Sequence, residues 1–334
     1  MALYILRRLV GLAVVLVGMS FVVFLVTRTL PGDPARAALG DDAPAERVAD
    51  YRRELGLDRP ILVQYGWYVA DMVHGNFGES IISRRPVVAD LKQFLPATIE
   101  LAVLSVIVGI VGGMGLGLGS VLAPGRLAVG LARALPILSL SVPTFWLGLV
   151  LQLVLYGKLG WLPFGGQWDV AFPTAPGVTG FLLVDTVLTG EPVMVTRALA
   201  HLAMPTFVLA QVSLGAFARV TRSALLDVLG EQFVRTARAK GLGPRAVLLR
   251  HVLPVAAAPI VTVIGLRLGS VLGGAVLTET IFAWPGIGRY AVFSIENLDF
   301  PAIMGFVLFV SFTYAFLNFL VDLCCVWLDP RVRV

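Results

Sequence analysis

The segment RTARAKGLGPRAVLLRHVLP, Arg235 to Pro254, decides how this chain is arranged. Six of its twenty residues are basic, counting His251, and none is acidic. It lies between two apolar stretches, 198–218 and 252–278, each long enough to cross a lipid bilayer. A cationic segment of this kind is too polar for hydrocarbon. The sequence therefore predicts two membrane helices joined by a charged connection that lies outside the membrane.

The overall composition supports an integral membrane protein. Hydrophobic residues make up 57% of the 334 residues and charged residues only 14%, whereas soluble domains carry about 25% charged residues. Lipid offers no hydrogen bonds to the backbone, so segments that cross it must be helices or closed barrels. Apolar runs of this length favour helices. We therefore expect an all-α membrane protein.

Six segments are long and apolar enough to span the membrane. They are 9–26, 101–123, 134–157, 198–218, 252–278 and 301–321, the last continuing toward residue 328. The first is longer than the 7–15 apolar residues of a typical signal peptide, so 1–30 is expected to stay as a transmembrane helix. The apolar run 170–184 is interrupted by prolines and a glycine and is interpreted as a loop.

The distribution of cations predicts the orientation of the six helices. With both termini inside, the cationic segment and most other loop cations face the cytoplasm, as the positive-inside rule requires. The net charge of +5 is then explained by topology and indicates no nucleic-acid partner. We expect a multi-pass protein of a prokaryotic plasma membrane. Its parts are an N-terminal helix (1–30), an extracytoplasmic loop region (31–96) and a core domain (97–334).

The connection at 221–254 is expected to form two helices. Apolar residues of the first recur at three- and four-residue steps: Leu226, Leu229, Phe233 and Ala237. Gly241 is predicted to end this helix, and Pro244 to begin a second one that ends near Pro254. Such an amphipathic hairpin can rest on anionic lipid or dock on another protein. The residues alone leave both interpretations open.

One pattern in this hairpin resembles a known family. Arg235-Thr236-Ala237, then Gly241, then His251-Val252-Leu253-Pro254 resembles the E-A-A-x3-G-x9-I-x-L-P loop of ABC importer permeases. Arg, Thr and His replace the Glu, first Ala and Ile. FVRTARAKGL (233–242) is similar to the YVRTARAKGL of dipeptide and oligopeptide permeases, a branch that also includes nickel and glutathione permeases.

The resemblance extends over nearly the whole chain. It includes PGDP (31–34), GNFGES (75–80), LPATIELA, SVPTFWLGL (141–149), GGAVLTETIFAWPGIGR (273–289) and NFLVDLCCVWLDPRVR (318–333). Two departures occur: Asn76 replaces an Asp common in the family, and HVLPVAAAP replaces the common HALRNALLP.

The resemblance implies a type I ABC importer permease that moves short peptides into the cytoplasm. Its partners would be a second, homologous permease, two ATPase subunits or one fused ATPase, and an extracytoplasmic substrate-binding protein. ATP and Mg²⁺ would be held by the ATPase, because this chain lacks the G-x-x-x-x-G-K-[ST] motif. The coupling helix implied by the family would use Arg235, Thr236, Ala237, Arg238, Lys240, Gly241, Leu242, Leu253 and Pro254.

Two charged residues near the fifth segment are candidates for the translocation path. Arg267 is the one charge within 252–278, and Glu279 follows that segment directly. Arg267 can form a structural ion pair with Asp322 or Glu279, or it can line the path and meet a peptide carboxylate. Both interpretations stay open.

Other functions are less well supported by the sequence. The chain has no H-E-x-x-H or G-x-S-x-G motif, so it is not expected to be an enzyme. Adjacent Cys324 and Cys325 provide no metal-site spacing. The alternatives are the same importer class carrying nickel, glutathione or another small solute, or an ion-coupled secondary transporter. A secondary transporter would need intramembrane acids or an inverted repeat, and a membrane receptor or scaffold is a third alternative.

Overall fold

The computed structural model describes residues 2–29, 34–39, 43–54, 56–122, 126–169, 172 and 177–328. Within these ranges the chain is helical and no β-strand forms, apart from a single bridge between Glu79 and Pro86. The all-α expectation is therefore confirmed. The chain divides into two compact units, Met1–Thr98 with Pro285–Phe319 and Ile99–Trp284 with Leu320–Val334.

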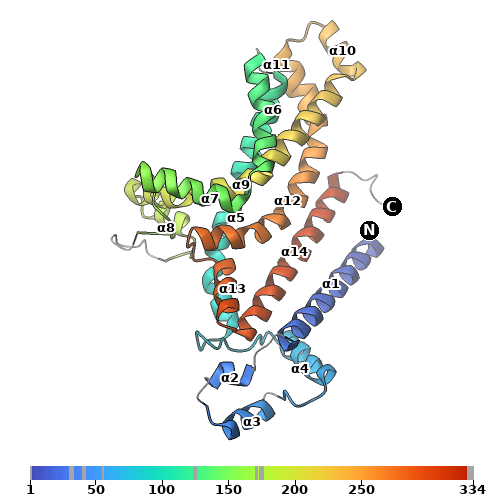
Figure 1. The fold of residues 1–334 in the computed structure, drawn as a ribbon. Helices are drawn as coiled ribbons and strands as arrows, with labels where there is room; N and C mark the ends of the chain where they lie inside the picture. The colour runs from blue at the N-terminus through green and yellow to red at the C-terminus, as the bar shows by residue number, and fades with distance from the viewer. Residues whose placement is uncertain are drawn as a thin grey trace. The chain divides into compact units, whose positions relative to one another are not determined.

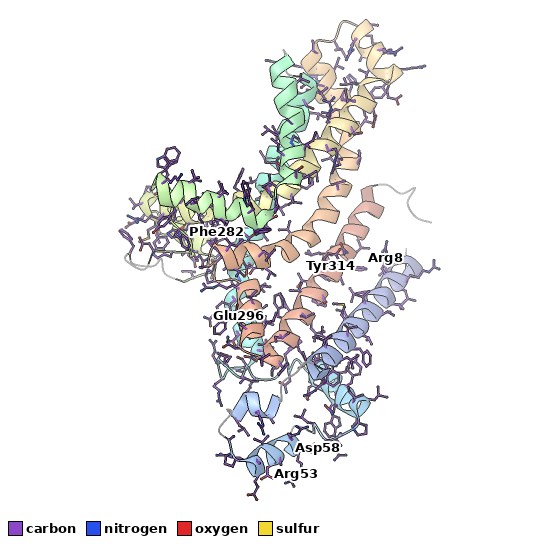
Figure 2. All side chains as sticks on the ribbon, in the orientation of Figure 1. Arg8, Arg53, Asp58, Phe282, Glu296 and Tyr314 are labelled. Carbon is purple, nitrogen blue, oxygen red and sulfur yellow. The ribbon has the colours of Figure 1, made fainter. Side chains whose placement is uncertain are left out.

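The first unit contains the N-terminal helix and the segment expected to be a long loop. Its helices are α1 (Ala2–Thr29), α2 (Pro34–Leu39), α3 (Ala45–Glu54), α4 (Ile61–Val73), the start of α5 (Val87–Leu122), α13 (Ile287–Glu296) and most of α14 (Phe300–Leu328). Figure 2 labels Arg8 on α1, and Arg53 and Asp58 at and after the end of α3. The region 31–96 is therefore largely helical.

Two buried carboxylates hold a turn of the first unit in place. Asp299 accepts hydrogen bonds from the Ser80 hydroxyl at 2.5 Å and from the Ile82 amide at 3.3 Å. Asp90 accepts one from the Ser83 hydroxyl at 2.5 Å. Both carboxylates are about 1% exposed, so the bonds are shielded from water. They attach the 79–86 turn to α5, which contains Asp90, and to Asp299, the residue directly before α14.

The second unit is arranged around one long helix. α9 (Pro192–Leu229) contacts α6 (Arg126–Ser141), α7 (Thr144–Leu151), α8 (Leu182–Leu188) and α12 (Leu253–Ile281). The remaining elements are the π-helical segment η1 (Gln152–Lys158), then α10 (Gln232–Ala239), α11 (Pro244–Val247) and η2 (Leu248–Val252). Figure 1 shows α6, α9 and α12 running together toward α10 and α11 at one end of this unit.

The expected third span, 134–157, is not one continuous helix. The chain bends by 99° between Ala134–Ser141 and Thr144–Lys158. Pro143 causes the break, because the residue before a proline avoids the helical region and Pro143 itself is extended, with φ −60° and ψ 134°. The Val142 carbonyl is freed by the bend and accepts a hydrogen bond from Gln211 Nε2 on α9 at 2.9 Å.

Glycines allow α5 and α9 to approach closely. A β-carbon on Gly113 would lie 2.7 Å from the Leu214 carbonyl oxygen, and one on Gly117 would lie 2.8 Å from that of Ala218. The glycine-rich stretch of α5 therefore serves close helix packing. Its partner is α9 of the same chain.

Among the described residues, four helices are long and apolar enough to cross a membrane, or five if the bent pair forms one span. They are Ile5–Arg28, Val87–Leu122, Pro192–Leu229 and Phe300–Leu320. The expected span 252–278 is helical as part of the 29-residue α12, whose central side chains lie outside the described set. The count of six therefore stays a prediction.

We expect Gly113→Val to destabilise the second unit by about 1–3 kcal/mol, because its β-carbon would collide with α9 backbone. Gly115→Val is the matched control, because nothing lies within 4 Å of a β-carbon at Gly115. The thermal midpoint of each purified variant in detergent measures the effect. Equal midpoints for the two variants would contradict the close crossing of α5 and α9.

Candidate functional site

The candidate site is the cationic hairpin, residues 231–252, which joins α9 to α12. It begins where α9 ends at Leu229 and Glu231 becomes extended, with φ −69° and ψ 150°. The expected continuous helix through this point is therefore wrong. Leu226 and Phe233 of the predicted apolar face are 46% and 40% exposed, so this face is not the buried one.

The turn between the two short helices has the expected geometry. Gly241 has φ +78°, a conformation that glycine adopts readily and other residues rarely do. Its amide donates to the Arg238 carbonyl at 3.0 Å, and the Leu242 amide donates to the Ala237 carbonyl at 3.3 Å. These two bonds form a Schellman motif. The prediction that Gly241 ends the helix is confirmed.

The second helix begins as predicted but ends differently. α11 starts at Pro244, after Gly243 as its N-cap. The chain then passes through the π-helical turn η2 directly into α12. The expected end near Pro254 is therefore wrong, because Pro254 lies in the first turn of α12, where a proline needs no hydrogen-bonded amide.

The inner face of the hairpin is locked onto the ends of three long helices. The buried residues of this cluster are Ala224, Leu225, Val228, Val234, Ala237, Val247, Val252 and Ala256. Leu118 and Val121 from the end of α5 pack against them. Since α9 and α12 enter the same cluster from both ends of the hairpin, the hairpin is a rigid extension of these helices.

The outer face of the hairpin is cationic. Arg235, Arg238, Lys240, Arg245 and Arg250 are all exposed. Within the described part of the chain, none of the five lies within ion-pair distance of a carboxylate. Figure 2 shows side chains projecting outward from α10 and α11 at the end of the unit. The arrangement can bind an acidic surface of complementary shape.

The structure brings most of the predicted coupling residues together. Arg235, Thr236, Arg238, Lys240, Gly241 and Leu242 lie on the exposed side of α10 and its turn. Ala237 instead faces inward at 5% exposure. Leu253 and Pro254 lie at the start of α12, beyond η2.

Several exposed residues of this face were not among the predicted site residues. Phe233 and Leu249 are 40% and 62% exposed, and the cations Arg245 and Arg250 are exposed beside them. Exposed apolar side chains among the cations add contact area for a binding partner. Gly230 was the sequence signal for the break between α9 and α10, because a glycine after an apolar helical run often ends a helix.

Of the two expected translocation residues, only Glu279 has a described side chain. The Arg267 side chain lies outside the described residues. Glu279 is 0% exposed, and its carbonyl accepts a hydrogen bond from the Trp284 amide at 2.8 Å. Phe282, labelled in Figure 2, is also buried. Glu279 therefore lies in a sealed turn rather than in water, and about 18 Å of helix separates it from Arg267.

No metal site is found in the described residues: they contain no group of three or more His, Cys, Asp or Glu side chains that could hold a metal ion. The side chains of Cys324 and Cys325 lie outside the described set.

Comparison with known proteins identifies the family. Residues 109–334 match the binding-protein-dependent transport system inner membrane component, and residues 1–102 match the N-terminal model of such membrane components. The chain belongs to this family. It is therefore a permease subunit of a binding-protein-dependent transport system, as the resemblance of its hairpin implied.

Full-length relatives agree with this assignment, and a solved structure shares the fold. The chain is 46% identical to the probable D,D-dipeptide transport system permease DdpB of Escherichia coli, over 98% of this chain and 96% of the relative. It is 37% identical to the dipeptide transport system permease DppB of Alkalihalophilus pseudofirmus over the full length of both. A crystal structure of an amino acid ABC transporter with histidines shares the fold, with a TM-score of 0.50 at 14% identity over 73% of this chain and 95% of that chain.

We expect Gly241→Val to strain the hairpin of this permease by about 1–2 kcal/mol, because a side chain is disfavoured at φ +78°. Gly243→Val is the matched control, because Gly243 has φ −64° and open space for a β-carbon. Trypsin should cleave after Arg238 and Lys240 faster in Gly241→Val than in Gly243→Val. Equal cleavage rates would show that the turn does not depend on glycine.

Proposed function

We propose that this chain is the transmembrane subunit of a type I ABC importer that moves short peptides into the cytoplasm. ATP would be hydrolysed on separate ATPase subunits, which hold the nucleotide and Mg²⁺. The observation that carries the proposal is the cationic hairpin, whose inner face is locked to α9 and α12 and whose outer face is exposed. Membership of the permease family supports it.

The proposed coupling mechanism follows from this rigid attachment. The hairpin docks as a coupling helix in a groove of an ATPase subunit, with Arg235, Arg238 and Lys240 against acidic groups. When nucleotide binding closes the ATPase pair, the hairpin moves as one body with the ends of α9 and α12. Packed helices transmit such displacement because their cores resist continuous deformation. The motion then alternates access to the path between two permeases.

The proposed topology keeps six spans with both termini in the cytoplasm of a prokaryotic cell. The N-terminal helix (1–30) and the extracytoplasmic region (31–96) precede a core domain (97–334) that contains the hairpin. The helical region 31–96, with its turn held by Asp90 and Asp299, is the proposed dock for the substrate-binding protein. A second, homologous permease completes the path, in which Arg267 and Glu279 are the residues to test.

Short peptides are the proposed cargo because both full-length relatives reported above are named for dipeptides. Nickel and glutathione are the alternative cargoes within the same importer class. The fold does not decide between them, because one scaffold supports several substrates. In such a system the binding protein makes the first selection, so cargo is decided by an uptake assay with all three solutes.

We expect the double charge reversal Arg235→Glu with Arg238→Glu to reduce co-purification of ATPase subunits about tenfold, since about 1.4 kcal/mol of lost attraction suffices. Lys158→Glu is the control, because Lys158 is exposed at the end of η1, outside both the hairpin and the proposed dock at 31–96. The tagged chain is isolated from membranes of its native host, and dipeptide uptake is measured in the same cells. Uptake should fall in the double variant and persist in the control.

Two results would contradict the proposal. Normal dipeptide uptake by the double variant would show that the hairpin does not couple the permease to an ATPase. Uptake that follows an ion gradient and continues after ATP depletion would identify a secondary transporter.

A further inference from the structure

A pocket of about 290 Å³ lies between α6 and α9 of the second unit. Its lining residues are Pro136, Ile137, Leu140, Gly215, Ala218, Arg219 and Arg222. The pocket ends where the two helices touch, because a β-carbon on Gly215 would lie 2.8 Å from the Pro136 carbonyl oxygen. Figure 1 shows α6 and α9 side by side along this region.

The pocket is apolar except at Arg219 and Arg222. These two residues follow Gly215 by four and seven positions, so they continue the same face of α9. Arg222 is held in place, because its Nη1 donates to the Ser120 carbonyl and hydroxyl oxygens, each at 3.0 Å. Arg219 is exposed. In the described part of the chain, neither guanidinium lies within ion-pair distance of a carboxylate.

We propose that this pocket binds an anionic phospholipid. The acyl chain would lie along Ile137 and Leu140, and the phosphate would be held by Arg219 and Arg222. The distribution of charge favours an anionic lipid, because the two arginines can bind its phosphate and the adjoining apolar surface can contact its acyl chain. A peptide would need polar partners along its length, whereas the described lining residues of α6, Pro136, Ile137 and Leu140, have apolar side chains. Basic pockets between membrane helices bind lipid phosphates in this way.

The position of the arginines agrees with the level of lipid headgroups. Arg222 precedes the end of α9 at Leu229 by seven residues, which is about 10 Å of helix. The cationic hairpin starts just beyond that end. With the orientation proposed above, the bound phosphate would belong to a lipid of the cytoplasmic leaflet. No other step of the lipid proposal uses this orientation. The bound lipid would then brace α6 against α9 next to the hairpin.

The test is native mass spectrometry of the intact transporter complex in detergent, with phosphatidylglycerol or phosphatidylcholine added. We expect phosphatidylglycerol to remain bound and phosphatidylcholine to bind at least tenfold less. Arg219→Gln, which removes the exposed cation, and Ile137→Trp, which fills the pocket, should each reduce bound phosphatidylglycerol about tenfold. Inorganic phosphate at millimolar concentration should not displace the lipid, because it lacks the acyl contacts.

Matched controls separate binding from folding. Arg53→Gln removes one exposed cation of the first unit, and Leu138→Trp adds the same ring beside the pocket at a residue that is 56% exposed. Both controls should keep wild-type lipid binding. Because the measurement requires no transport, its result is independent of the proposed cargo and coupling.

Three results would overturn the lipid site. Equal binding of the two lipids would show that the arginines do not select a headgroup. Unchanged binding in both Arg219→Gln and Ile137→Trp would place the lipid elsewhere. Efficient cross-linking of Ile137→Cys to the second permease would show that protein covers the pocket.

Discussion

The need to satisfy every backbone polar group inside lipid governs the second unit. Hydrocarbon supplies no donor for a free carbonyl, so a helix can break within the membrane only where protein replaces the lost bond. The break at Val142 and Pro143 meets this condition because α9 presents Gln211 to the free carbonyl. A second amide, Gln152, donates to the carbonyls of Phe164 and Ile281. Gln211 thus makes the bend at Pro143 compatible with a membrane protein, and Gln152 satisfies carbonyls at the end of α12 and in the loop after η1.

The central position of α9 follows from its small and polar side chains. α5 can lie against it because Gly113 and Gly117 leave room for its carbonyl oxygens. On another side of α9, Gly215 leaves room for the backbone of α6 at Pro136. Close backbone approach adds dispersion contacts, which are a main source of helix association in lipid. α9 is therefore held on several sides, and a displacement at its end is carried along its length.

Local backbone conformation could be predicted from the sequence where a single residue determines it. Gly241 and Pro244 define the turn by their own conformational limits, so the hairpin was predictable. The buried face was not, because packing against α5 and α12 buries Leu225, Val228 and Val234 while Leu226 and Phe233 stay exposed. The bend at Pro143 also has a local signal, but the direction of α7 depends on Gln211, which is 69 residues away in the chain. Pairings of this kind require the tertiary structure.

The two sets of cations in the second unit differ in what surrounds them, and this decides their roles. The arginines of the hairpin stand on an exposed surface, where attraction to a partner is screened by salt and affects association most. Arg222 is instead anchored to Ser120 and adjoins an apolar pocket. The positive-inside rule assigns both sets to one side of the membrane. Only the packing distinguishes the proposed protein-docking surface from the proposed lipid site.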